Sequence, residues 1–425
     1  MKKKLALGAM SLAAVVALAG CSTGGSGSGD AAASGGDSGT IRVLVANFPA
    51  NNVGQGVFDQ IVAEFHKKFP NVKVESDFVP YDSLNQKIST SLASGQSYDV
   101  ISAGVGWVQP LADLGALQSL TKLGITEDDL KDSVYPSFVD PMLFDKEVYA
   151  VPVVANPRLV AYSKSAFEAA GLDPTKPPQS LDELREDAKK LTIRDAAGNI
   201  TQTGFDFWAP PSNYRQQFVA FMGAKGANEF TKGEPTFAGP AGVDALTLIH
   251  DMISEDKSST YGYQNSAKTS LVTTGEAAMG FTGPYVDCSD AGIGAKCDDL
   301  VYFNLKDKEE VQYVGGRVVG VGEGSKNTEA ALGMVKAFQN DAIQEAISKI
   351  DVGVPVNKNA GTSDFVESNP AAKFAWENLD KGVFEYGGAS FLDFRAKFGP
   401  ALDQVILGQK TAKDTLDELK AIAQG

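Results

Sequence analysis

The apolar positions of the chain alternate between a spacing typical of buried strands and one typical of helices. Residues 41–45 form an almost continuous apolar run, as in a strand buried on both faces of a parallel sheet. An apolar stripe at i, i+3, i+4 and i+7 from Phe58 to Phe65 predicts a helix that ends before Pro70. Residues 72–74, 84–92 and 99–102 continue as strand, helix and strand. This order predicts an α/β fold with right-handed crossovers.

The alternation continues to the end of the chain. A strand-like stretch at residues 148–162 is interrupted by Pro152 and Pro157, and a second one lies at residues 318–321, so we expect the chain to cross between two lobes there. Ser180 and Glu183 match a capping box in front of a helical stripe. Further apolar patterns predict a strand at 277–281 and helices around 246–253, 331–338, 402–406 and 416–422.

The first forty residues carry an export signal. Three lysines precede an apolar stretch at residues 5–18, which is too short for an ordinary transmembrane helix. The stretch ends in Leu-Ala-Gly-Cys21, which resembles the lipobox of bacterial lipoproteins; the alternative is a secretory signal with a chance cysteine. We expect a signal peptide over 1–20, a lipid such as palmitate on Cys21, and a flexible Ser/Gly-rich tether over 21–40. The protein would then sit on the outer face of the cell membrane.

Length and charge narrow the class of protein. The 425 residues predict two or three domains, and 43% hydrophobic residues are enough for a sizeable core. The net charge of −15 and the lack of a clustered basic surface make nucleic acid a poor candidate partner.

Export also determines the expected oxidation state of the cysteines. With Cys21 lipidated, Cys288 and Cys297 remain as an even pair in an oxidising compartment, so we predict a disulfide. Two free thiols or a metal site are the alternatives, and a zinc centre is improbable without nearby histidine. We expect no metal and no cofactor.

Several runs resemble one family. They are FDQIVAEFHKKFPNVKVESDFVPYDSLNQKISTSLASGQSYDVISAGVGWVQPLADLGALQSL from Phe58, VYAVPVVANPRLVAYSKSAFEAAGL from Val148, TTGEAAMGFTGPY from Thr273 and VGGRVVGVGEGSKNTEAALGMVKAFQ from Val314. In kind and order they are similar to the extracellular solute-binding proteins of family 1, which serve carbohydrate ABC importers and include maltose-binding protein. The likeness covers essentially all of residues 41–425.

The resemblance implies a two-lobed, periplasmic-binding-protein-like α/β fold (Venus flytrap) with discontinuous lobes and a hinge. The N-terminal lobe would combine residues 41–153 and 272–319, and the C-terminal lobe residues 158–271 and 322–425. Crossings near 153–158 and 318–322 would form the hinge. In such a protein the lobes rotate shut over the ligand, a closure that a permease can sense.

Sugars present apolar C–H faces and vicinal hydroxyls, so a sugar site combines aromatic rings with side chains that offer paired hydrogen-bond donors and acceptors. Trp208 lies in a Pro-rich stretch before a helix, Trp107 follows a predicted strand end, and Tyr285 lies at the edge of the cleft by family resemblance. Each could instead pack within the fold. Trp376, at helical spacing, is as well explained by packing.

Polar candidates come from three places. Gly316 and Arg317 precede the second crossing, where Arg317 could donate a fork of hydrogen bonds or form an interlobe salt bridge. Phe391 and Asp393 lie in a Gly-rich, aromatic stretch, where stacking and hydroxyl binding compete with a helix cap plus packing. Lower-ranked candidates, carried mainly by position in the family pattern, are Asn47, Phe48, Asp82 and Asn156.

A binder is favoured over an enzyme. The chain lacks HExxH, GxxxxGK[ST] and GxSxG, and neither of its 2 histidines has a visible nucleophile partner. We expect a monomeric, lipid-anchored protein that captures a carbohydrate, chiefly an oligosaccharide, for the permease subunits of an ABC importer. A secreted glycoside hydrolase, an adhesin and a binder of a non-sugar solute remain alternatives. The absence of a basic cluster disfavours a phosphorylated ligand, although Arg158, Arg215 and Arg317 could converge in space.

Overall fold

The computed structural model describes residues 38–46, 48, 51–208, 214–231, 233–262, 269–385, 387–388 and 390–424. The predicted lipobox cysteine Cys21, the tether up to residue 37 and the candidate Asn47 lie outside the described residues. Within those ranges, no helix combines the length and the apolar character that a membrane crossing needs.

Parallel strands begin the fold, as the apolar pattern predicted. β1 (Gly39–Ala46) pairs in parallel with β2 (Val72–Val79) on one side and with β3 (Val100–Gly104) on the other. The connecting helices are α1 (Asn52–His66) and α2 (Tyr81–Ala93). The predicted stripe of α1 is its buried face, so this part of the sequence interpretation is confirmed.

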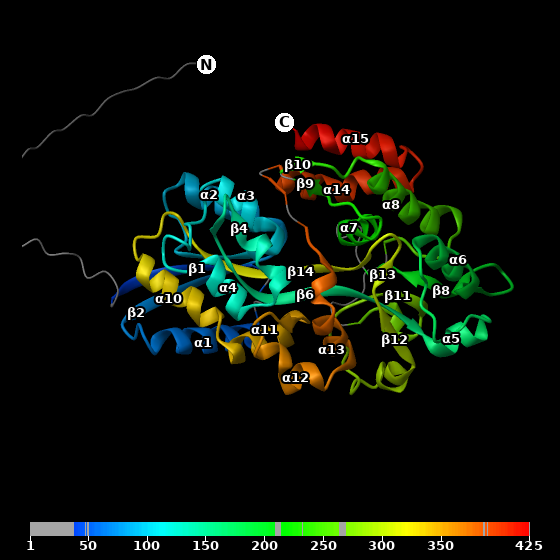
Figure 1. Cartoon of the computed structure of the whole chain (residues 1–425), viewed down its shortest axis with the longest axis horizontal. Helices are drawn as coiled ribbons and strands as arrows, with labels where there is room; N and C mark the ends of the chain where they lie inside the picture. Colours follow the sequence, from blue (N-terminus) through cyan, green and yellow to red (C-terminus); the bar gives the residue numbers. More distant parts are fainter. Residues whose placement is uncertain are drawn as a thin grey trace, which may run out of the picture. The chain divides into compact units, whose positions relative to one another are not determined.

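Two long strands run through the middle of the molecule. β6 (Val151–Ser163) and β14 (Glu310–Val321) pair with each other antiparallel, and Figure 1 shows them joining the elements drawn on the left to those on the right. The last part of β14 also pairs with β3, whereas the last part of β6 pairs with β11 (Ala277–Thr282) and β12 (Leu300–Phe303). The sheet order is β2-β1-β3-β14-β6-β11-β8-β7.

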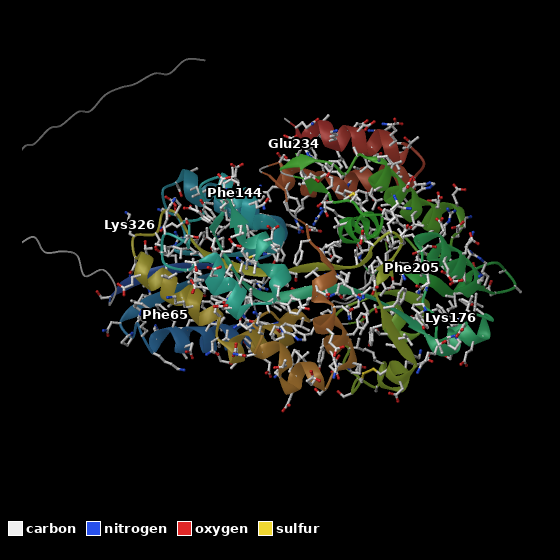
Figure 2. The ribbon with its side chains drawn as sticks, viewed as in Figure 1. Phe65, Phe144, Lys176, Phe205, Glu234 and Lys326 are labelled. Atoms are coloured by element: carbon white, nitrogen blue, oxygen red, sulfur yellow. A yellow bond between two sulfur atoms is a disulfide. The ribbon has the colours of Figure 1, made fainter. Side chains whose placement is uncertain are left out.

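The far end of the sheet is built around β8 (Ile200–Asp206), which pairs in parallel with β11. α6 (Leu181–Leu191) begins at the predicted cap: the Ser180 hydroxyl accepts from the Glu183 amide at 3.0 Å. The Glu183 carboxylate accepts from the amide of Gln179 at 2.7 Å, one residue before the cap, so the reciprocal bond of a capping box is displaced. Phe65 of α1 and Phe205 of β8 mark the buried cores at the two ends (Figure 2).

The pairing differs from the expected division into residues 41–153 with 272–319 and residues 158–271 with 322–425. β11 and β12, expected in the N-terminal lobe, pair with β6 beyond Pro157 and β11 also with β8. Conversely, α10 (Thr328–Phe338), expected in the C-terminal lobe, packs against α1, and Gly333 of α10 lies close to the ring of Phe69, which follows α1. The apolar pattern identifies strands but does not specify their neighbours, and neighbours decide the lobe.

The chain closes with α14 (Phe391–Ile406) and α15 (Ala412–Ala423), which lie beside α8 (Pro240–His250) at the top of Figure 1. The Sγ atoms of Cys288 and Cys297 lie 2.07 Å apart and their Cα atoms 5.9 Å apart, which is a bonding geometry.

The remaining elements are mostly short. The strands are β4 (Leu143–Phe144), β5 (Glu147–Val148), β7 (Ile193–Arg194), β9 (Phe230–Thr231), β10 (Glu234–Pro235), β13 (Leu305–Lys306), β15 (Val354–Pro355) and β16 (Gly382–Val383). The α-helices are α3 (Val108–Asp113), α4 (Glu127–Ser133), α5 (Lys164–Ala169), α7 (Arg215–Ala224), α9 (Leu271–Thr274), α11 (Asp341–Asp351), α12 (Asp364–Glu367) and α13 (Pro370–Glu377). Short 3-10 helices are η1 (Val105–Trp107), η2 (Pro136–Phe138), η3 (Asp140–Met142), η6 (Gly294–Asp299), η7 (Ala360–Thr362) and η8 (Leu379–Lys381), and η5 (Asp251–Glu255) is a π-helical segment that follows α8.

Candidate ligand-binding site

Three arginines gather around one buried carboxylate where the long strands meet α7 and α14. Glu385 follows β16 and is only 7% exposed. Its carboxylate forms an ion pair with Arg215 at the start of α7, and a longer one, Nη1–Oε2 3.6 Å, with Arg395 of α14. Arg158, on β6, completes what we call the central arginine cluster: Arg158, Arg215 and Arg395 around Glu385.

Arg158 points at this cluster because of its register. It lies opposite Tyr313 of β14, and Glu385 and Tyr313 both influence its pKa. Its Nε donates to Oε1 of Gln216 at 2.9 Å, and its guanidinium lies over the ring of Trp208, 4.8 Å from the centroid. Burial lowers the pKa of Arg158, because the surroundings disfavour its charge. An amide and an aromatic face are weak compensation for a half-buried cation.

Glu229 lies beside the cluster but does not neutralise it. Burial raises the pKa of this carboxyl to about 8, against the opposing effect of Arg215. Neither carboxyl oxygen has a hydrogen-bond partner among the described residues. Burial therefore favours the protonated, neutral form of Glu229.

Aromatic side chains from the end of the sheet formed by β1, β2 and β3 lie close to the cluster. The guanidinium of Arg395 lies 5.9 Å from the ring centroid of Tyr81 and 5.8 Å from that of Trp107, and the two rings are 6.4 Å apart. The backbones are also close: a Cβ on Gly106 would lie 2.5 Å from the carbonyl oxygen of Glu385. Elements from the two ends of the sheet thus touch at this point, and any residue but glycine at position 106 would push them apart.

A second, compensated ion pair lies on the β3 side of β14. Arg317 is 1% exposed, and its Nε and Nη2 donate to Oδ2 of Asp351 at 2.9 and 2.6 Å. Arg317 also donates to the carbonyl of Ala46 and lies over Phe48, which stacks on Phe78 with centroids 5.9 Å apart. Burial raises the pKa of Asp351, while Arg317 opposes the shift. Arg317 therefore tethers α11 to β14 and does not join the central arginine cluster.

Trp208 contacts both the cluster and the segments before α9 and after β11. Its Nε1 donates to the carbonyl of Thr269 at 3.1 Å, and a Cβ on Gly283 would lie 2.9 Å from its ring. Tyr285 is half-buried and stacks on Phe365, with centroids 5.3 Å apart and planes 16° from parallel. These two rings remain our candidate sugar platforms.

Two candidates lie along the crossing itself. The side-chain amide of Asn156 donates to the carbonyls of Asp351 and Val352, at 3.1 and 3.4 Å, and so holds the end of α11 against β6. A Cβ on Gly316 would lie 2.3 Å from the carbonyl of Val154, so that glycine is needed for strand packing.

The other candidates lie elsewhere. Asp82 and Asp393 are exposed on α2 and α14, and neither forms an ion pair with a described residue. Phe391 is fully buried, with Arg215 5.5 Å from its ring centroid. Trp376 packs edge-on against Tyr135, at 4.9 Å, and against Gly361. Phe391 and Asp393 lie in the first turn of α14, which begins at Phe391.

Sequence reasoning missed Glu385, Arg395 and Glu229. It named Arg158, Arg215 and Arg317 as arginines that could converge; the first two do, and the third pairs with Asp351. The expectation that no basic cluster exists is therefore wrong for the interior. Arg395 resembles any solvated charge on a helix, so the sequence offers no signal for it. Among the described residues, no group of three His, Cys, Asp or Glu side chains is arranged to hold a metal ion.

The chain matches known proteins along most of its length. Residues 50–345 match the model of the bacterial extracellular solute-binding proteins. A putative binding protein of Brucella abortus is 24% identical, covering 82% of this chain and 87% of its own. The diacetylchitobiose-binding protein DasA of Streptomyces coelicolor is 25% identical, covering 71% of this chain and 70% of its own.

Among solved structures, the maltose-bound MalE3 of T. maritima superposes with a TM-score of 0.72 at 20% identity, covering 91% of this chain and 99% of its own. The fold is thus the two-lobed α/β fold of periplasmic solute-binding proteins, with lobes that are discontinuous in sequence, as predicted. Because the family model spans well over half of the chain, the protein belongs to the bacterial extracellular solute-binding protein family.

Proposed function

We propose that this protein captures a carbohydrate outside the cytoplasm and delivers it to the permease subunits of an ABC importer. The observation that carries the proposal is the meeting of aromatic rings with arginine forks where the two ends of the sheet touch. Rings suit the C–H faces of a sugar, and guanidinium groups suit its vicinal oxygens. DasA and MalE3, named for diacetylchitobiose and bound to maltose respectively, support this class of solute.

The strand pairing supports a revised division into lobes. The first lobe would combine residues 39–154 with 318–356, and the second residues 158–315 with 364–424, because β11, β12 and β8 share one end of the sheet. The hinge would lie where β6 and β14 pass between the ends. Closure would be favoured by the amount that the solute binds the closed state better than the open one.

The proposal also includes the anchoring and the oxidation state that we expect from the sequence. A lipid on Cys21 would hold the protein at the outer face of the membrane, and the tether would let a monomeric body turn above the permease. Cys288 and Cys297 would form a disulfide in that compartment, in agreement with their Sγ–Sγ distance.

The proposal is tested by calorimetric titration of the purified protein, without its signal peptide, against neutral and acidic oligosaccharides and neutral control solutes. We expect at least one oligosaccharide to bind with a dissociation constant in the micromolar range or below, about −8 kcal/mol or stronger. Product analysis of the same mixtures should find intact sugar. Binding of no sugar in the panel, or turnover of the sugar, would overturn the proposal.

A further inference from the structure

The central arginine cluster carries more positive than negative charge. Arg158, Arg215 and Arg395 provide three guanidinium groups, and Glu385 is the carboxylate that pairs with two of them. Burial raises the pKa of Glu229, which favours its neutral form over one that would offset this charge. Even with Glu229 ionised, three cations would face two carboxylates.

The surplus is not removed by other parts of the chain. Arg158 contacts the side-chain amide of Gln216 and the ring of Trp208, and it forms no ion pair with a carboxylate of the described residues. Arg395 has only the 3.6 Å contact to a carboxylate that Arg215 already engages. The segments between residues 47 and 389 that the structure leaves undescribed contain no aspartate or glutamate in the sequence. They cannot supply the missing charge.

Buried cations without counter-charges are costly, so proteins normally pair them. Here burial lowers the pKa of both Arg158 and Arg395, and the nearby charge of Arg215 adds to the effect on Arg395. The nearby Arg317–Asp351 pair is the contrast within the same protein, because one carboxylate there accepts two bonds from its arginine. The difference indicates that the central arginine cluster lacks an anion.

Among the arginines that pair with Glu385, Arg395 is the one that a solute can reach from solvent. Its side chain is 22% exposed, whereas that of Arg215 is 2% exposed. Its guanidinium lies close to the rings of Tyr81 and Trp107, from the other end of the sheet. A group bound there would touch both ends of the sheet.

We propose that the solute carries an anionic oxygen group, a carboxylate or a phosphate, which binds Arg395 and offsets the surplus charge of the central arginine cluster. This deepens the proposed function, on which it rests: the carbohydrate is an acidic one. Guanidinium groups match both oxyanions, because their planar forks can bind two oxygens at once.

Calorimetry tests the inference with pairs of probes that are alike except that one is anionic and the other neutral. The probes are trigalacturonate and its fully methyl-esterified, neutral form, and glycerol 3-phosphate and glycerol. We expect at least one anionic probe to bind at least tenfold more tightly than its neutral counterpart. Preference for trigalacturonate identifies a carboxylate, and preference for glycerol 3-phosphate identifies a phosphate.

Variants then locate the contact. Arg395→Gln should weaken binding of the preferred anion at least tenfold, Arg395→Lys should restore part of that loss, and Lys308→Gln, which removes an exposed cation from the turn between β13 and β14, should change nothing. Thermal unfolding should find all three folded. An unchanged affinity for the anion in folded Arg395→Gln would overturn the contact.

The outcomes separate this inference from the proposed function. Tight binding of neutral sugars, with anionic probes no tighter, would overturn the anionic group and leave carbohydrate capture standing. Binding of glycerol 3-phosphate alone, with no sugar of any charge, would support the anion and overturn the carbohydrate. Binding of none of the probes or sugars would overturn both.

Discussion

Trp208 adopts a backbone conformation that a bulky residue rarely takes, with φ at +46°. Its amide donates to Oδ1 of Asp206 at 3.0 Å, its indole to Thr269, and Arg158 stacks on its face. Such strain costs roughly 1–3 kcal/mol and persists only where the surroundings hold it. The arrangement fixes one aromatic face beside the central arginine cluster.

Replacing this ring should weaken sugar binding without unfolding the protein. For Trp208→Ala we expect a dissociation constant about five- to thirtyfold higher, equivalent to about 1–2 kcal/mol of lost stacking. Calorimetry with the tightest sugar measures the change. Tyr302→Ala, which truncates a half-buried ring on β12 near Phe374, is the matched control and should bind as wild type. Wild-type affinity in folded Trp208→Ala would contradict this platform.

Glu229 should make stability depend on pH. Its pKa in the folded state, about 8, is above that of an unfolded glutamate, so ionisation favours the unfolded chain between about pH 4.5 and 8. Glu229→Gln should therefore raise the free energy of unfolding at pH 7 relative to wild type. The gain should vanish near pH 4 and level off above pH 8.

Urea unfolding at pH 4, 7 and 9 measures this difference, with the exposed Glu323→Gln as the control that should show no such trend. A Glu229→Gln variant that is less stable than wild type at pH 7, and equally so at pH 4, would mean that the ionised carboxylate stabilises the fold.

At the scale of elements, local patterns predicted the regular segments well. The buried run at residues 41–45 and the stripe of α1 depend only on spacing along the chain, and both were confirmed. The expected assignment of residues 272–319 to the first lobe differs from the observed pairing of β11 and β12, because pairing with β8 and the far part of β6 is decided by packing between distant segments. Glu385 and Arg395 were missed for the same reason: their roles arise only when β16 and α14 meet α7.

The loop between Cys288 and Cys297 should be stabilised by its disulfide. A Cys288→Ser, Cys297→Ser double variant should lose about 2–3 kcal/mol of unfolding free energy, because the closed loop restricts the unfolded chain. Urea denaturation of the variant and of reduced wild type should agree. Two reactive thiols in denatured, non-reduced mature protein would contradict the bond.

At the scale of the whole molecule, the proposed anchor separates a membrane-bound end from a folded body. Expressed in a bacterial host, Cys21→Ser should move the protein from the membrane pellet to a non-pelleted fraction, because the lipid attachment atom is lost. Ser22→Ala should stay in the pellet. Fractionation with an antibody against the body measures both, and a pelleted Cys21→Ser would contradict lipid anchoring.

The net charge of the whole chain, −15, differs in sign from the charge of the central arginine cluster. Negative charge dominates the sequence, yet the central arginine cluster is positive. An overall charge therefore says little about the solute, which meets a few side chains where the two ends of the sheet touch.

We propose above all that a carbohydrate binds where β6 and β14 join the two ends of the sheet. Hydrogen–deuterium exchange of the wild-type protein, with and without the tightest sugar of the calorimetric panel, tests it most directly. We predict slower exchange at residues 104–107, 206–208, 313–317 and 390–395, from both ends of the sheet. Protection confined to one end, or located away from these residues, would contradict the claim.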